Sequence, residues 1–150
     1  MQYAEKYPEP RYRLEDILES IGDDELALEL YDEVDSAVGR YWDLVARHEH
    51  ARSIQQFRLE APAYRDLHER LDQSRRIAHN ALVDKLAILA RTAQKSGSDT
   101  TWWNGSHGLE RGGRVGIAQW ALSVEFGRIS NRAREEDNTY AKTGRATTNA

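Results

Sequence analysis

The 150-residue chain contains no cysteine, only three prolines and no apolar run of the roughly 20 residues that cross a membrane. Without cysteine it has no disulfides, thiolate zinc sites or cysteine nucleophiles, and a reducing compartment suits such a chain. The N-terminus lacks the apolar segment that a secretory signal needs. We therefore expect a cytoplasmic protein without membrane segments. The prolines, at positions 8, 10 and 62, leave long stretches free to form uninterrupted helices.

Hydrophobic residues make up 39% of the chain and charged residues 31%, a balance typical of a folded domain. A chain of this length can bury one core. We assign residues 1–136 to a single domain. Residues 137–150, which are rich in threonine, asparagine and alanine, are expected to be a disordered tail.

The net charge of −4 conceals an asymmetry along the chain. Residues 1–45 contain thirteen acids and four bases, whereas residues 46–150 contain twelve acids and seventeen bases. Between Leu14 and Gly39 there are ten acids and no base. One interpretation is an acidic helix that packs beside basic helices of the same domain. The other is an acidic face that docks on a basic partner or mimics nucleic acid, with binding residues Glu25, Glu29 and Asp32.

Apolar residues recur at helical spacing through most of the chain. The spacing predicts four helices, over residues 12–21, 24–52, 62–95 and 114–136. A weaker helical pattern covers 53–61, and the glycines of 97–113 indicate a loop around Trp102 and Trp103. The expected fold is all-α: a four- or five-helix bundle with a Gly/Trp loop before the last helix. On that helix the apolar face should comprise Val115, Ala118, Leu122, Phe126, Ile129 and Ala133.

Charged residues interrupt the apolar stripe of the helix over 62–95. Arg75 lies inside the stripe that includes Leu71 and Leu82, and Asp72 and His79 lie on its flank. Tyr64, Leu67, Ala78, Leu86 and Leu89 complete this stripe. A guanidinium in an apolar stripe needs a partner or an exit to water.

The helix over 24–52 also turns polar at its C-terminal end, where His48 and Arg52 take core positions and Glu49 flanks them. If the two helices run antiparallel, these groups meet Asp72, Arg75 and His79 in a polar layer. Either the layer is a salt-bridge network that fixes helix register, or it is an acid–base site. The candidate catalytic residues are Glu49, Asp72, Arg75, Arg76 and His79.

Two patterns that would indicate a metal or a nucleotide are absent. No two histidines stand four residues apart, and Arg75 would repel a cation from the neighbouring His68, Asp72 and His79. The chain also lacks the Gly-x4-Gly-Lys-Ser/Thr phosphate-binding pattern. We expect neither a metal nor a cofactor.

The segment 100–114 is a second candidate binding surface. Its glycines let a ligand approach the backbone, while Trp102 and Trp103 supply contact area. These indoles either cap the bundle or bind a partner. Nucleic-acid binding has weaker support, because Glu135, Glu136 and Asp137 dilute the field of the basic residues. Those basic residues are Arg111, Arg114, Arg128, Arg132 and Arg134.

Several short motifs carry a family resemblance. They are Tyr64-Arg65, Leu71-Asp72, Arg75-Arg76-Ile77-Ala78-His79-Asn80-Ala81-Leu82, Ala46-Arg47-His48-Glu49, Arg114-Val115-Gly116 and Trp120-Ala121. The chain resembles, over residues 12–135, a family of small bacterial helical proteins classified only as a domain of unknown function. The resemblance implies a helical fold and no established activity. The resemblance also implies that Glu49, Asp72, Arg76 and His79 are the first residues to consider as functional.

The leading functional interpretation is a non-catalytic cytoplasmic protein that binds another protein through its acidic helical face, as a regulator or inhibitor. Small acidic cysteine-free helical proteins are common on phages and other mobile elements, which makes such a setting plausible by association. The alternative is a small helical hydrolase or nuclease that uses the Glu/Asp/Arg/His cluster. Whether the protein is an enzyme, and whether it forms a homodimer, is left open by the sequence.

Overall fold

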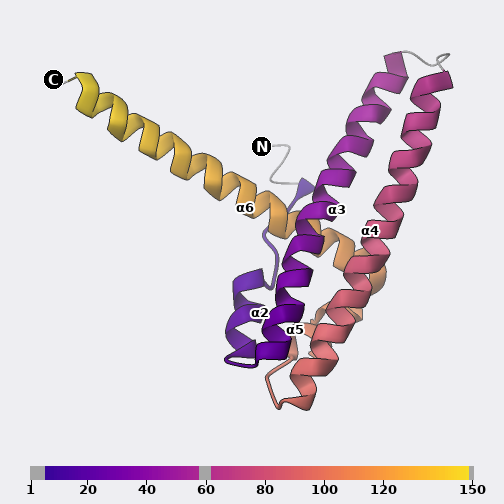
Figure 1. Ribbon diagram of the computed structural model, residues 1–150, viewed down its shortest axis with the longest axis vertical. Helices are drawn as coiled ribbons and strands as arrows, with labels where there is room; N and C mark the ends of the chain where they lie inside the picture. Colours follow the sequence, from indigo (N-terminus) through magenta and orange to yellow (C-terminus); the bar gives the residue numbers. More distant parts are fainter. Residues whose placement is uncertain (1–5, 58–61, 149–150) are drawn as a thin grey trace.

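The computed structural model describes residues 6–57 and 62–148, without the side chains of 55–57 and 139–148. The described residues form five helices and no strand (Figure 1). In chain order they are α2 (Leu14–Ile21), α3 (Glu25–Phe57), α4 (Pro62–Lys95), α5 (Thr101–Asn104) and α6 (Leu109–Thr148). The expected all-α bundle is confirmed.

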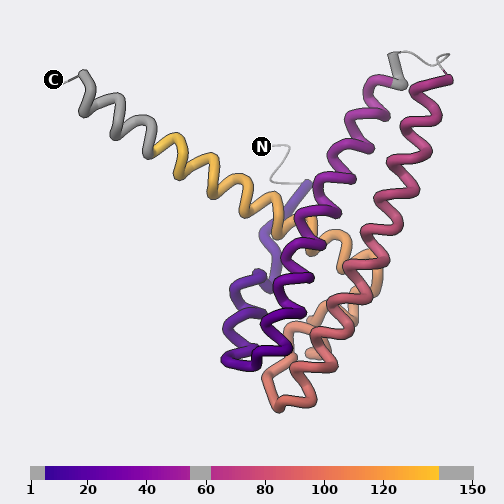
Figure 2. The backbone as a smooth tube through the Cα atoms, viewed as in Figure 1, coloured from indigo at the N-terminus to yellow at the C-terminus, as the bar shows by residue number. Residues whose placement is uncertain are grey.

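The body of the molecule is an antiparallel hairpin of α3 and α4, which lie side by side over most of their length (Figure 2). Each helix turns its apolar stripe toward the other and toward the core, because residues three and four apart share a helix face. The buried members of the two stripes include Ala27, Tyr31, Val34, Val38 and Tyr41 on α3 and Ala78, Leu82, Leu86 and Leu89 on α4. The helical spacing predicted over 24–52 and the C-terminal part of the predicted α4 stripe are thereby confirmed.

The other helices cover one face of this hairpin, with α6 crossing it (Figure 1). α2 buries Leu14, Ile17 and Ile21 in the same core. The segment before α2 is fixed to α6, since the indole N–H of Trp120 donates a hydrogen bond to the carbonyl of Tyr12 at 2.6 Å. The opposite face of the hairpin is left uncovered, and this face carries the groove described below.

The end of the hairpin away from α2 has a thinner apolar seam. No α4 residue before Ala78 is buried, and Leu67, expected in the stripe, is 41% exposed. Tyr64 and Leu71 are only partly buried. None of the described helices is both long and apolar enough to span a bilayer.

The region around the last helix differs from the sequence prediction in three respects. The expected loop over 97–113 contains α5 and the first turn of α6, and the helix continues to Thr148 rather than ending near 136. Its buried face is also different, because Ile117, Trp120, Ala121 and Val124 are buried whereas Val115 is 71% exposed. The domain boundary at residue 136 therefore falls inside a helix. Residues 149–150 and the side chains of 139–148 lie outside the described part of the chain, so disorder over 137–150 stays a prediction.

α6 is interrupted at Gly113, where φ is 63° and ψ is −160°. Residues other than glycine rarely adopt this backbone conformation, because their Cβ atom clashes with the backbone. We expect Gly113→Ala to lower the free energy of unfolding by about 1–3 kcal/mol in urea titrations. Gly112→Ala is the matched control, because Gly112 has no positive φ and an added Cβ meets no atom within 4 Å. Gly112→Ala should be neutral or stabilising by up to ~1 kcal/mol. Equal effects of the two changes would contradict the backbone argument.

Candidate functional site

The charged residues expected between α3 and α4 meet around the carboxylate of Asp72. Its Oδ1 accepts a hydrogen bond from Arg75 Nη2 at 2.8 Å, and its Oδ2 pairs with Arg76 Nε at 3.1 Å. From α3, His48 Nε2 lies 3.6 Å from the same Oδ1. We call Asp72, Arg75, Arg76 and His48 the polar layer. The Asp72 and Arg75 side chains are 27% and 28% exposed, so the layer lies at the edge of the helix interface.

The polar layer has a defined charge state near neutral pH. The hydrogen bond from Arg75 is the main cause that lowers the pKa of Asp72, and the same bond raises the pKa of Arg75. Burial, followed by the nearby His68 and Arg75, lowers the pKa of His48. The rings of His48 and His68 are 4.4 Å apart. Asp72 is therefore ionised and His48 is neutral at pH 7.

Two of the predicted catalytic candidates do not join this layer. Glu49 points away from it and pairs with Lys6 Nζ at 2.9 Å. The reason is helical geometry: Glu49 follows His48 by one residue, which turns it by about 100°. His79 packs on the ring of Tyr41 at 5.5 Å between centroids, and its Nε2 lies 2.9 Å from the backbone carbonyl of Arg114. The expectation that Glu49 and His79 converge with Asp72 is therefore wrong.

The polar layer lines neither of the two cavities described below. Asp72 already has two guanidinium partners, which leaves it a poor base. The arrangement can fix the register of α3 against α4, because a slip by one helical turn would separate His48 from Asp72.

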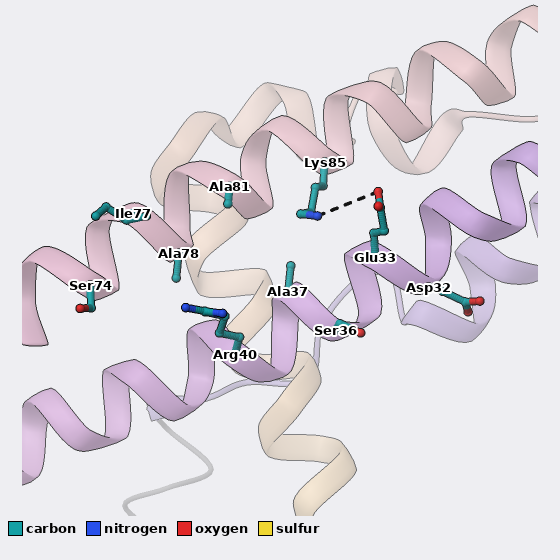
Figure 3. Close-up of a pocket in the computed structure, with 10 residues that line it drawn as sticks. All are labelled: Asp32, Glu33, Ser36, Ala37, Arg40, Ser74, Ile77, Ala78, Ala81 and Lys85. Atoms are coloured by element: carbon teal, nitrogen blue, oxygen red, sulfur yellow. Dashed lines mark ion pairs between the residues drawn. The ribbon is translucent and has the colours of Figure 1, made fainter.

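The uncovered face of the hairpin carries a groove of about 570 Å³ between α3 and α4 (Figure 3). Its floor consists of Ala37, Ala78 and Ala81. One ion pair crosses it, between Lys85 Nζ and Glu33 Oε2 at 3.9 Å. The rims are formed by Asp32, Ser36, Arg40, Ser74 and Ile77. We call this feature the α3–α4 groove.

A row of carboxylates follows one edge of α3 beside the groove. Glu25, Glu29 and Asp32 are all exposed, and they make no hydrogen bond or ion pair with any described residue. Asp32 also lines the α3–α4 groove. We call these three residues the acidic row. Among the acids between Leu14 and Gly39, two form ion pairs with described residues of another helix: Glu33 with Lys85 of α4 and Asp35 with Arg128 of α6. Packing beside basic helices therefore explains only these two.

The tryptophan pair belongs to the core rather than to the surface. Trp102 is 3% exposed, so its assignment as a partner-binding residue is wrong. Trp103 is partly buried against the same core. Nearby, a cavity of about 400 Å³ separates the segment before α2 from the start of α6, and Arg11, His107 and Arg111 line it.

Comparison with known proteins identifies a family. Residues 2–134 match the family described as a protein of unknown function (DUF3232). The chain belongs to this family. No curated protein and no solved structure matches it. The DUF3232 match includes every residue of the polar layer, the acidic row and the α3–α4 groove, and it confirms the resemblance stated from the short motifs.

One buried cluster in this DUF3232 chain was missed by the sequence analysis. The side chain of Glu125 is only 8% exposed and pairs with Arg128 Nη2 at 3.0 Å and Arg132 Nη2 at 3.4 Å. Arg128 also pairs with Asp35 of α3. Burial, with Asp35 next in effect, raises the pKa of the neighbouring Tyr31 to about 12. The signal was present in the sequence: Glu125 follows Ala121 by four residues, which places it on the same face of α6. Because the predicted apolar face of this helix comprised other residues, Glu125 was not predicted to be buried.

The DUF3232 chain offers no constellation for a metal among its described residues. No group of three or more histidine and carboxylate side chains is placed to hold an ion there. In the polar layer two guanidiniums flank the carboxylate and take the place a cation would need.

Proposed function

We propose that this protein is a non-catalytic binding protein that docks on a basic surface of another protein through its acidic row. The observation that carries the proposal is the exposure of Glu25, Glu29 and Asp32 without any partner among the described residues. Like charges at i and i+4, as at Glu25 and Glu29, repel and destabilise a helix slightly. A basic partner would remove that repulsion and would be steered to the surface by its field.

Exposed carboxylates without an ion pair among the described residues also lie outside the acidic row. Glu15 and Glu19 of α2 and Asp23 before α3 are also exposed and form no ion pair within the described ranges. Such a concentration of one sign of charge is a poor stabiliser of the fold. It favours association with an oppositely charged surface, which speeds encounter and makes binding sensitive to salt.

The test begins with a photo-cross-linking residue placed at Glu29 in cells of the source organism, which identifies the neighbouring protein. The purified neighbour is then titrated by isothermal calorimetry. We expect its affinity to fall at least about ten-fold on the triple change Glu25→Lys, Glu29→Lys and Asp32→Lys, and to weaken as salt rises.

The matched control reverses the same number of exposed acids elsewhere. Glu110→Lys, Glu136→Lys and Asp137→Lys change the net charge by an equal amount on α6. If both triple variants weaken binding equally, net charge rather than the acidic row decides, and the proposal fails. Failure of any protein to cross-link from Glu29 in those cells would also overturn it.

The hydrolase or nuclease alternative has less support from the geometry. Of its five candidate residues, Glu49 pairs with Lys6 and His79 faces the carbonyl of Arg114, while Asp72 is occupied by Arg75 and Arg76. A general base needs a free lone pair within reach of a substrate. In this proposal the polar layer therefore has a structural role, which is to fix the register of α3 against α4.

The cellular setting belongs to the same proposal. The absence of cysteine supports a reducing compartment such as the cytoplasm. A role as a regulator or inhibitor encoded by a bacterial mobile element rests on the acidic composition and small size alone.

A further inference from the structure

Three large apolar side chains lie exposed on the uncovered face of the hairpin. Ile77 is 62% exposed, Ile88 is 47% exposed and Leu26 is 59% exposed. On α4, Ile77, Ala81 and Ile88 stand at i, i+4 and i+11, which places them on one side of the helix. The Glu33–Lys85 ion pair sets the antiparallel register. Along the hairpin axis, Leu26 and Ile88 therefore lie on one side of this ion pair, and Ile77 lies on the other.

We propose that the α3–α4 groove binds an amphipathic helix of a partner protein, with the apolar stripe of that helix on the alanine floor and its basic end against the acidic row. This inference rests on the proposed function and specifies the element by which the partner docks.

The floor of the groove suits a helix because its residues are small. Ala37, Ala78 and Ala81 leave room for apolar side chains of a third helix to reach the seam between α3 and α4. Such a helix would also cover Ile77, which has no apolar cover of its own at 62% exposure. The partner would complete on this face what α2 and α6 do on the other (Figure 1).

The charges along the groove define the orientation of the bound helix. Asp32 lies toward one end, whereas Arg40 lies toward the other and reaches across the groove toward Ala78 (Figure 3). Glu29 precedes Asp32 by three residues on α3, so it lies beyond the Asp32 end. Arg40 forms no ion pair with any described residue. Glu29 and Arg40 are separated by about 16 Å along α3. The partner helix therefore needs about three turns, with arginine or lysine at one end and a carboxylate at the other.

The probes are three synthetic peptides of 16 residues labelled with fluorescein. The first has leucines at i, i+3, i+4 and i+7, basic residues at one end and a glutamate at the other. The second keeps every charge but replaces the leucines by glutamine. The third keeps the leucines but exchanges the charged ends. Fluorescence anisotropy with the full-length protein should show at least about ten-fold tighter binding of the first peptide than of either other peptide.

Two tryptophan variants locate the binding site. Ala81→Trp fills the groove floor and should reduce the affinity of the first peptide at least about ten-fold. Ala46→Trp places the same side chain at an exposed α3 position that does not line the groove, and should leave the affinity unchanged. Circular dichroism of each variant checks that the fold persists. Should Ala81→Trp unfold the protein, Ile77→Gln replaces it, since Ile77 is largely exposed.

The outcomes separate this inference from the proposed function. If the leucine and glutamine peptides bind equally, and both lose affinity on reversal of the acidic row, the docking of a basic partner survives and the helix-in-groove inference is overturned. If reversal of the acidic row changes nothing, the proposed function fails. Self-association that disappears in Ala81→Trp, seen by sedimentation, would assign the groove to a second copy and would also overturn the inference.

Discussion

Leu86→Ala is expected to lower the free energy of unfolding by about 2–5 kcal/mol. Leu86 is fully buried, and it lies in the cluster that joins the α3 stripe to α4. Removing its branched end loses the transfer free energy of the deleted groups and leaves a cavity that the long rigid helices cannot fully close. For a domain of this size the melting temperature should fall by roughly 2–4 °C for each kcal/mol lost.

The control for this change is two residues away on the same helix. Ile88→Ala removes a similar volume from a side chain that is 47% exposed, so it should cost less than half as much. Both variants are compared by urea denaturation with the same m value. An equal loss for the two would mean that the seam between α3 and α4 does not carry the stability of the domain.

The α3 and α4 stripes were predictable because periodicity records burial directly. Val34, Val38, Leu82 and Leu86 stand three, four or seven residues from other core members, and all four are fully buried. The bounds of α4, from Pro62 to Lys95, follow from a proline that favours a first turn and from a glycine after the last turn.

The last helix was harder because two apolar faces compete there. The sequence offers Val115, Leu122 and Ile129 on one side and Ile117, Trp120 and Val124 on another. The choice between them depends on which side meets α3, and no local rule contains that information. Of the two interpretations of Trp102, a cap on the bundle or a binding residue, its burial in the core cluster favours the cap.

The candidate site was predictable in part for a related reason. Polar residues on the two facing stripes correctly indicated that His48, Asp72 and Arg75 meet, since antiparallel helices place such positions opposite each other. A residue on the flank of a stripe can turn to either side. Asp72 faces His48, whereas Glu49 and His79 have their partners in Lys6 and the backbone of Arg114. The α3–α4 groove could not be predicted from the sequence, because the packing of α2 and α6 decides which face of the hairpin stays uncovered.

Asp72→Ala is expected to lower the free energy of unfolding at pH 7 by about 1–3 kcal/mol. The change leaves the guanidinium of Arg75, which is mostly buried, without its carboxylate, and removes the partner that His48 faces. Asp84→Ala, at an exposed α4 position with no ion pair among the described residues, makes the same chemical change and should stay within about 0.5 kcal/mol.

The pH dependence separates this ion pair from a packing effect. Arg75 lowers the pKa of Asp72 below its ordinary value in the folded state. A carboxylate with a lowered folded pKa contributes stability that is present above its unfolded pKa, about 4, and that is lost as the pH falls through the folded pKa. The difference between the native protein and Asp72→Ala should therefore be constant from pH 7 to about 5 and shrink below pH 4. A difference that stays the same at pH 3 would show that Asp72 acts through packing and not through its charge.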